Sequence, residues 1–240
     1  MNIILVIAIF LVVHVLFDFY FQPSKWVDSK NAEGFKSKYL YWHCFIYALA
    51  VSGVVFILTS VWWLTIVAFV AVGISHLLVD ALKKEYKGNA AYFFIDQLVH
   101  IFVLGFFVWQ VCVKQTIEVD KNWLIVLLLY ALGYLIVLKP FGITAKNIMD
   151  TFDFKPSEKG LKDGGLWIGY IERFLILTFV LMSYYEGIGF LLAAKSIFRF
   201  GELKNDNEIK RTEYILIGTL LSFGLAVCIG MLIKMTLNYL

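Results

Sequence analysis

The sequence predicts an all-α, polytopic integral membrane protein, on the strength of its composition and the length of its apolar runs. Of the 240 residues, 61% are hydrophobic and 16% are charged, whereas an average soluble domain carries about 25% charged residues. Apolar runs such as 3–17 and 122–138 are almost unbroken, and roughly 17–25 apolar residues span a bilayer as a helix. We therefore expect a bundle of about eight transmembrane helices, with no separate soluble domain.

The first half of the chain, residues 1–113, is expected to form four membrane helices. No basic residue precedes the first apolar run and no small-residue cleavage site follows it, so we expect this run to be retained rather than removed as a signal peptide. Apolar stretches bounded by polar residues place the helices at 2–20, 39–59, 61–82 and 91–113. Pro23 falls in the first polar connection, where a helix breaker is expected.

The second half, residues 122–240, is expected to form four more helices. The same reasoning places them at 122–138, 166–184, 186–202 and 210–238. The segment 186–202 is short for a membrane helix and carries Lys195 and Arg199. A seven-helix arrangement, in which this segment re-enters or lies at the membrane surface, therefore stays open.

The stretch 139–165 is expected to be a cytoplasmic loop, long enough to act as a lid. It contains Pro140 and Pro156 and mixes charged residues with glycine. Its Gly164-Gly165 pair lacks the remaining spacing of a phosphate-binding loop, so the sequence predicts no nucleotide site there.

Basic residues indicate the orientation in the membrane. With eight crossings both chain ends lie on one side, and that side holds only Lys114, Lys121 and Lys234 among the 21 Lys and Arg residues. Because basic loops stay in the cytoplasm, we expect both termini outside. If 186–202 does not cross, the last basic loop would lie outside and the bias would weaken.

The histidines and their aspartate neighbours form the most informative pattern. Three pairs stand four residues apart near predicted helix ends: His14 with Asp18, His76 with Asp80, and Asp96 with His100. His43 begins the helix 39–59, and the sequence contains no other histidine. Positions i and i+4 share one helix face, and antiparallel connections bring these four helix ends to the cytoplasmic side. We therefore expect all seven side chains to converge there.

Such a cluster needs compensation, because an ionised carboxylate inside a membrane helix costs about 2.5–3.5 kcal/mol. Side chains that face lipid headgroups would need none, and proton-linked Asp–His pairing would supply some. The third explanation is a metal, since imidazole and carboxylate suit Zn²⁺ first, and also Mn²⁺, Fe²⁺ or Ni²⁺. The candidate ligands are His14, Asp18, His43, His76, Asp80, Asp96 and His100. They exceed the needs of one tetrahedral ion, which leaves one ion with carboxylates that orient imidazoles, or two ions.

These motifs also resemble a known family. The stretches are HVLFDFYFQ (14–22), YWHCFIYAL (41–49), GISHLLVDALK (73–83) and FFIDQLVHI (93–101). Over about residues 1–113 they resemble the bacterial membrane family known as domain of unknown function 3307. The resemblance implies a multi-pass protein of the bacterial inner membrane, with no settled function. A looser resemblance to bacterial membrane-bound metal-dependent hydrolases implies that the seven residues are ligands, with Gln22 and Gln97 as polar support.

The second half carries its own charged set: Glu172, Arg173, Lys195, Arg199 and Glu213. One interpretation is structural, with ion pairs among these residues holding the helices together. The other is that they bind substrate, with Arg and Lys steadying a phosphate or carboxylate.

Three functions follow from this pattern. The first is hydrolysis of a lipid or lipid-linked phosphate or ester by a metal-bound water, with Asp18, Asp80 or Asp96 as general base. The second is proton- or cation-coupled transport, and the third is a non-catalytic membrane subunit with a structural metal. The partners expected are membrane lipids, a lipid-linked substrate and a second copy of the chain. Nucleic acid is not expected, because the lysines lie in loops that flank the membrane.

Overall fold

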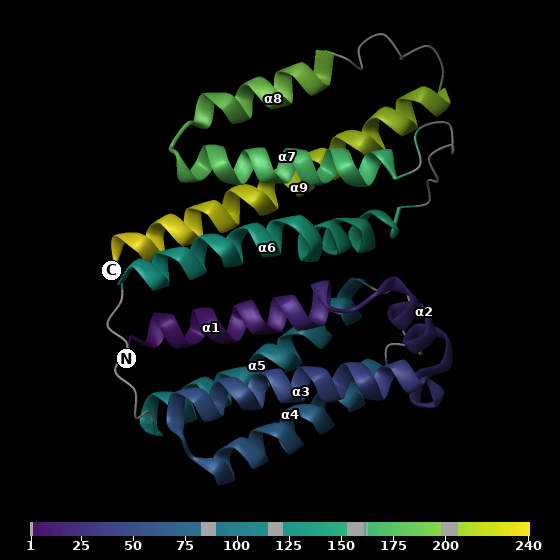
Figure 1. The fold of residues 1–240 in the computed structure, drawn as a ribbon. Coiled ribbons are helices and arrows are strands. Elements are labelled where there is room, and N and C mark those ends of the chain that lie inside the picture. Colours follow the sequence, from purple (N-terminus) through teal and green to yellow (C-terminus); the bar gives the residue numbers. More distant parts are fainter. Residues whose placement is uncertain (1, 83–89, 115–121, 153–160, 162, 198–205) are drawn as a thin grey trace. The chain divides into compact units, whose positions relative to one another are not determined.

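The structure is a computed structural model that describes residues 2–82, 90–114, 122–152, 161, 163–197 and 206–240 (Figure 1). Every regular element in these ranges is a helix, which confirms the all-α prediction. The chain divides into two compact units, Met1–Leu132 and Gly133–Leu240. Each unit is described by itself.

Unit 1 contains four long apolar helices and a short polar helix, α2 (Ser24–Glu33), which lies at one end of them (Figure 1). The elements are α1 (Ile3–Val15), the π-helical turn η1 (Leu16–Tyr20), α2 (Ser24–Glu33), the 3₁₀ turn η2 (Gly34–Lys36), α3 (Lys38–Thr59), α4 (Trp62–Leu82) and α5 (Ala90–Lys114). Helices α3 and α4 form a hairpin around Ser60, whose φ of 55° is left-handed. The hydroxyl of Thr59 supports this turn by accepting the Val61 N–H at 3.2 Å.

The core of unit 1 is apolar and joins all four long helices. Its buried members include Val6, Phe10, Tyr47, Val51, Val55, Leu64, Ala68, Val72, Leu104, Phe107 and Val111. The outward faces are apolar as well, with Trp42 57% exposed and Phe102 81% exposed. Helices that are apolar all round are typical of segments in lipid.

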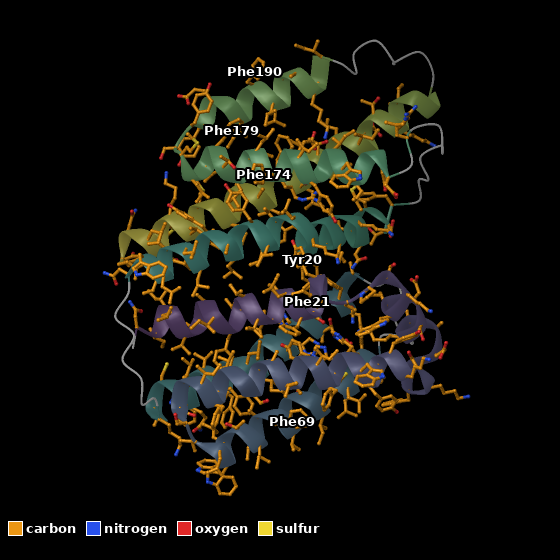
Figure 2. The ribbon with its side chains drawn as sticks, viewed as in Figure 1. Tyr20, Phe21, Phe69, Phe174, Phe179 and Phe190 are labelled. Atoms are coloured by element: carbon orange, nitrogen blue, oxygen red, sulfur yellow. The ribbon has the colours of Figure 1, made fainter. Side chains whose placement is uncertain are left out.

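Unit 2 contains α6 from Gly133 onward (the helix spans Asn122–Met149), α7 (Gly164–Leu181), α8 (Tyr185–Ile197) and α9 (Asp206–Asn238). Helices α7 and α9 run parallel. Arg173 donates to the Ser222 hydroxyl at 3.1 Å, and further along both helices Lys234 donates to the Ser183 hydroxyl at 2.5 Å. Figure 2 shows the side chains that project from these helices, among them Phe190 of α8, which is 74% exposed.

Helix α8 carries the chain back along α7. Near its end, Lys195 lies 2.6 Å from the carboxylate of Glu172, which belongs to the first half of α7. Helices α7 and α8 are therefore antiparallel. This agrees with the parallel course of α7 and α9, because α8 is the helix between them in the chain.

Seven helices in the described ranges are long and apolar enough to cross a membrane. They are Ile3–Tyr20, Lys38–Thr59, Trp62–Leu82, Ala90–Lys114, Asn122–Met149, Gly164–Leu181 and Ile209–Asn238. Helix α8 has 13 residues, fewer than the roughly 17–25 that a full span needs. The polytopic membrane bundle expected from the sequence is thus confirmed, with α8 as its short member.

One prediction is wrong: 139–149 is not loop, because α6 continues through Pro140 to Met149. A proline inside a membrane helix is tolerated where neighbouring side chains bond the carbonyls that it frees. Arg173 supports the turn just before Pro140, donating to the carbonyls of Val137 at 2.6 Å and Leu138 at 3.1 Å. Pro156 and most of the rest of the expected loop lie outside the described residues.

Helix α2 was not expected either. Its sequence, SKWVDSKNAE, has no apolar periodicity from which a helix could be predicted. Pro23 precedes its first residue, where the fixed φ of proline suits a helix start.

Candidate functional site

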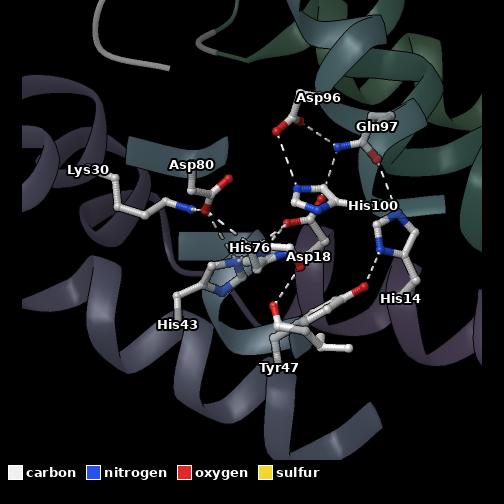
Figure 3. A network of polar contacts seen from close by, with 12 residues as sticks. His14, Asp18, Lys30, His43, Tyr47, His76, Asp80, Asp96, Gln97 and His100 are labelled. Atoms are coloured by element: carbon white, nitrogen blue, oxygen red, sulfur yellow. Dashed lines mark hydrogen bonds and ion pairs between the residues drawn. The ribbon is translucent and has the colours of Figure 1, made fainter. Parts of the chain in front are cut away.

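The functional site predicted from the sequence forms where four helix ends of unit 1 meet. These are the end of α1 with η1, the start of α3, the end of α4 and the start of α5. All seven predicted residues are buried there, none more than 6% exposed: His14, Asp18, His43, His76, Asp80, Asp96 and His100 (Figure 3). The i,i+4 spacing on each helix, together with the antiparallel order of the helices, brings them together.

Four ligand-type atoms converge at the centre of this cluster. The Nε2 atoms of His43 and His76 lie 2.9 Å apart. Asp18 Oδ1 lies 3.4 Å and 3.5 Å from these two nitrogens. Asp80 Oδ2 lies 3.6 Å and 3.8 Å from them. Two overlapping groups, Asp18/His43/His76 and His76/Asp80/His100, could therefore each hold a metal ion.

The imidazole of His76 is fixed in orientation by two stacked rings. Tyr47 stacks on one face with ring centroids 4.1 Å apart and an interplanar angle of 18°, and His100 stacks at 4.1 Å and 28°. His76 is 0% exposed, and its Nδ1 has no hydrogen-bond partner within the described part of the chain. The ring is thus held by stacking while its Nε2 points at His43 (Figure 3).

Gln97 connects the other members of the cluster. Its amide nitrogen donates to Asp18 Oδ2 at 3.1 Å and to Asp96 Oδ2 at 2.8 Å. Its amide oxygen lies 3.2 Å from His14 Nε2. Because that oxygen can only accept, His14 carries its proton on Nε2. In a neutral His14, Nδ1 then accepts from the Tyr47 hydroxyl, which lies 2.9 Å away.

Lys30 enters the cluster from α2. It is 2% exposed, and its ammonium donates to Asp80 Oδ2, the same oxygen that faces the two imidazoles. Within α2, all of which is described, Lys30 is the one buried residue. Helix α2 packs on α3 and α4 and places a cation beside the Asp80 carboxylate (Figure 3).

Asp18 lies in the π-helical turn. The Phe21 N–H bonds the Leu16 carbonyl at 2.8 Å, an i→i+5 bond that widens the helix locally. Such turns occur often at functional sites. Here the turn places Asp18 Oδ1 toward imidazoles from two other helices, α3 and α4.

The buried charges of the cluster do not cancel. Among the described residues, Asp18, Asp80 and Asp96 contribute three carboxylates against the ammonium of Lys30, so two negative charges remain when the imidazoles are neutral. Burying uncompensated charge costs several kcal/mol per ion even after relaxation. A divalent cation would balance the described charges of this site.

Sequence reasoning missed Lys30 and Tyr47. Lys30 is one of several lysines in a polar connection, and nothing in the sequence distinguishes it from Lys25 or Lys36. Tyr47 does carry a signal, since it stands four residues after His43, the spacing that relates the other pairs. Gln22, expected as polar support, is buried, yet its amide nitrogen has no hydrogen-bond partner in the described ranges.

The charged set of the second half is divided within unit 2. Glu172 and Lys195 form a half-buried ion pair between α7 and α8. Arg173 is 5% exposed and bonds α6 carbonyls, as described above. Glu213 is exposed on α9, and Arg199 lies outside the described residues. The observed contacts of Glu172, Lys195 and Arg173 hold helices together.

The fold and the buried network define the class: a polytopic α-helical membrane protein with a buried His/Asp cluster. A family profile described as protein of unknown function, DUF3307, matches residues 6–129. The chain belongs to this family. No curated protein and no solved structure matches it, and nothing in these comparisons shows the likeness to metal-dependent hydrolases.

Proposed function

We propose that the protein binds one divalent transition metal ion inside the membrane, Zn²⁺ being the best fit to its ligands. Asp18, His43 and His76 would be ligands, and Asp80 would fill the fourth position. Two imidazoles and two carboxylates make a donor set that suits Zn²⁺, with Mn²⁺, Fe²⁺ and Ni²⁺ as alternatives. Four more residues would orient these ligands through hydrogen bonds, as outer partners do in metal sites. They are His14, Asp96, Gln97 and His100.

The spacing of the four ligand atoms carries this proposal. A tetrahedral ion with arms of about 2.0–2.1 Å holds its ligand atoms about 3.3–3.4 Å apart. The three distances among Asp18 Oδ1, His43 Nε2 and His76 Nε2 run from 2.9 to 3.5 Å and fit these edges. Asp80 Oδ2 lies 3.6 Å and 3.8 Å from the two nitrogens but falls in the second group, so it would have to move toward Asp18 to complete the tetrahedron. The two groups that could hold a metal share His76, so we favour one ion over two.

The charge balance and the burial support the same proposal. One divalent ion would offset the two negative charges left by three carboxylates and Lys30. Four protein ligands in a closed site are typical of structural metal sites. Catalytic zinc sites instead keep one position open for water. The geometry therefore favours a metal-binding membrane protein over the hydrolase expected from the sequence.

The test is metal content. The protein, purified in detergent and loaded with each candidate ion, should retain one ion per chain by mass spectrometry. His76→Ala and Asp18→Ala should retain none. Ser52→Ala is the matched control, because Ser52 is buried in α3 but bonds only the Leu49 carbonyl among its recorded contacts. Wild-type protein without stoichiometric metal, or full occupancy in His76→Ala, would refute the proposal.

Hydrolysis stays a second candidate because of one feature. Asp80 Oδ2 accepts from Lys30, and if Asp80 stays with Lys30 the fourth position on the metal is open to a water. Asp18, His43 and His76 would then hold the metal, and Asp80 would act as general base toward that water. Metal-loaded protein would then release phosphate from vesicles that contain a lipid phosphate, such as phosphatidic acid. Asp80→Asn would abolish the release while metal stays bound. Wild type without turnover would exclude this candidate.

A further inference from the structure

An ion cannot reach the proposed site in the closed structure. Every predicted ligand is at most 6% exposed, so part of unit 1 has to move before an ion enters or leaves. The four long helices around the site, α1, α3, α4 and α5, bury large apolar residues in a shared core. Helix α2 does not: its one buried residue is Lys30.

Within the described ranges, few buried contacts fix α2 in place. Trp26 stacks on Tyr39, with ring centroids 5.7 Å apart and an interplanar angle of 19°. The hydroxyls of Ser29 and Ser37 lie 2.7 Å apart. The buried contact is the Lys30–Asp80 pair. Segments with few buried apolar contacts open at the lowest free energies.

The C-terminal end of α2 is suited to pivoting. Gly34 follows its last residue with φ 56° and ψ −128°, a conformation open mainly to glycine, whereas Pro23 before its first residue has a fixed φ and can turn only about ψ. Hinges are commonly a few such residues at the ends of elements. Between these points α2 can swing as a unit, and the swing would withdraw Lys30 from Asp80.

We propose that α2 is the gate of the metal site and that Lys30 is its latch. An ion enters from the end of unit 1 that α2 covers, when the Lys30–Asp80 contact opens. Once the ion is bound, Lys30 returns to Asp80, because three carboxylates then face one ammonium and one divalent ion. This inference rests on the proposed function, since the gated ligand is the divalent ion.

The experiment measures how fast Zn²⁺ leaves the loaded full-length protein into excess chelator. Lys30→Met removes the latch and should speed release by about tenfold or more, because opening no longer has to break the Lys30–Asp80 contact. Lys25→Met is the matched control: Lys25 is an exposed lysine on the same helix, near the Tyr39 ring. It should release Zn²⁺ at the wild-type rate.

A second variant keeps the test decisive if Lys30→Met does not fold. Ser29→Cys with Ser37→Cys, in a background with Cys44, Cys112 and Cys228 replaced by Ala, places two thiols where hydroxyls lie 2.7 Å apart. Their disulfide ties α2 to the first residue before α3. The oxidised protein should release Zn²⁺ about tenfold more slowly than the same protein after reduction, as expected when opening limits the rate.

The outcomes separate the two proposals. The gate alone would be overturned if the protein binds Zn²⁺ but the release rate changes neither in Lys30→Met nor on forming the disulfide. The proposed metal binding would then stand. Absence of bound metal in the unmodified protein would overturn the proposed function, and the gate with it. Faster release without Lys30, or slower release with the disulfide, would support the gate.

Discussion

The Nε2 atoms of His43 and His76 lie 2.9 Å apart where the helix ends of unit 1 meet, although the two residues are 33 positions apart in the chain. Each nitrogen also faces Asp18 Oδ1 and Asp80 Oδ2. As it stands, this contact is a hydrogen bond in which one imidazole donates and the other accepts. A metal ion would replace the shared proton and use both lone pairs.

Replacing either histidine should therefore abolish tight metal binding. We expect His43→Gln and His76→Gln each to weaken affinity by more than about 100-fold, since loss of an outer partner alone costs about 10–100-fold. Competition with a chelator of known affinity measures the effect. Cys44→Ala, next to His43 and also buried, is the control and should bind as wild type. A His76→Gln protein with wild-type affinity would remove His76 from the ligand set.

The Lys30–Asp80 pair should show strong coupling in the metal-free protein. Lys30→Met and Asp80→Leu each leave one buried charge alone and should lower the free energy of unfolding by about 3–5 kcal/mol. The double variant should recover most of this loss, because two apolar groups replace a fully desolvated pair. Unfolding in detergent, followed by circular dichroism, measures the cycle. Additive losses in the double variant would mean that the two side chains do not interact.

Tyr47 has two contacts that substitutions can separate. Tyr47→Phe keeps the ring on His76 but loses the hydroxyl bond to His14, so it should cost about 1 kcal/mol of stability and leave metal affinity unchanged. Tyr47→Ala also frees the His76 ring and should weaken affinity by about 10–100-fold. Thermal unfolding and chelator competition report the two effects separately. Equal affinities in the two variants would show that stacking does not orient His76.

Much of this site could be predicted from the sequence, because its chemistry depends on helix periodicity. The i,i+4 pairs on antiparallel helices place His14, Asp18, His76, Asp80 and their partners at one end of unit 1 whatever the detailed packing. The fold class followed in the same way from apolar runs of membrane length.

The features that escaped prediction depend on tertiary structure. Lys30 reaches Asp80 only because α2 folds over the helix ends, and polar connections carry no periodicity that indicates such a helix. The sequence predicts that the helix ends before Pro140. Instead, α6 continues through it, and Arg173 from α7 bonds a carbonyl of the preceding turn. Neither contact is visible from local sequence.

Arg173 should accordingly be a stability residue of unit 2. Arg173→Met would leave the carbonyls of Val137 and Leu138 without its donors, and we expect a loss of about 2–5 kcal/mol. Arg173→Lys should not restore it, because one ammonium cannot reproduce a forked guanidinium. Lys146→Met, an exposed substitution on α6, is the control. Thermal unfolding that is unchanged in Arg173→Met would contradict this role.

The path of α8 predicts where the chain ends lie. Because α7 and α9 are parallel and α8 returns between them, the second half should cross the membrane four times despite the short α8. Both termini should then lie outside, since nearly all basic residues fall on the other face.

In a cysteine-free background, a cysteine appended at either end should react with an impermeant maleimide in intact cells. Ala32→Cys, exposed on α2, should react only after permeabilisation, because the distribution of basic residues predicts α2 on the cytoplasmic side. Labelling of one terminus alone would mean that α8 does not cross, and labelling of position 32 from outside would reverse the orientation of the metal site.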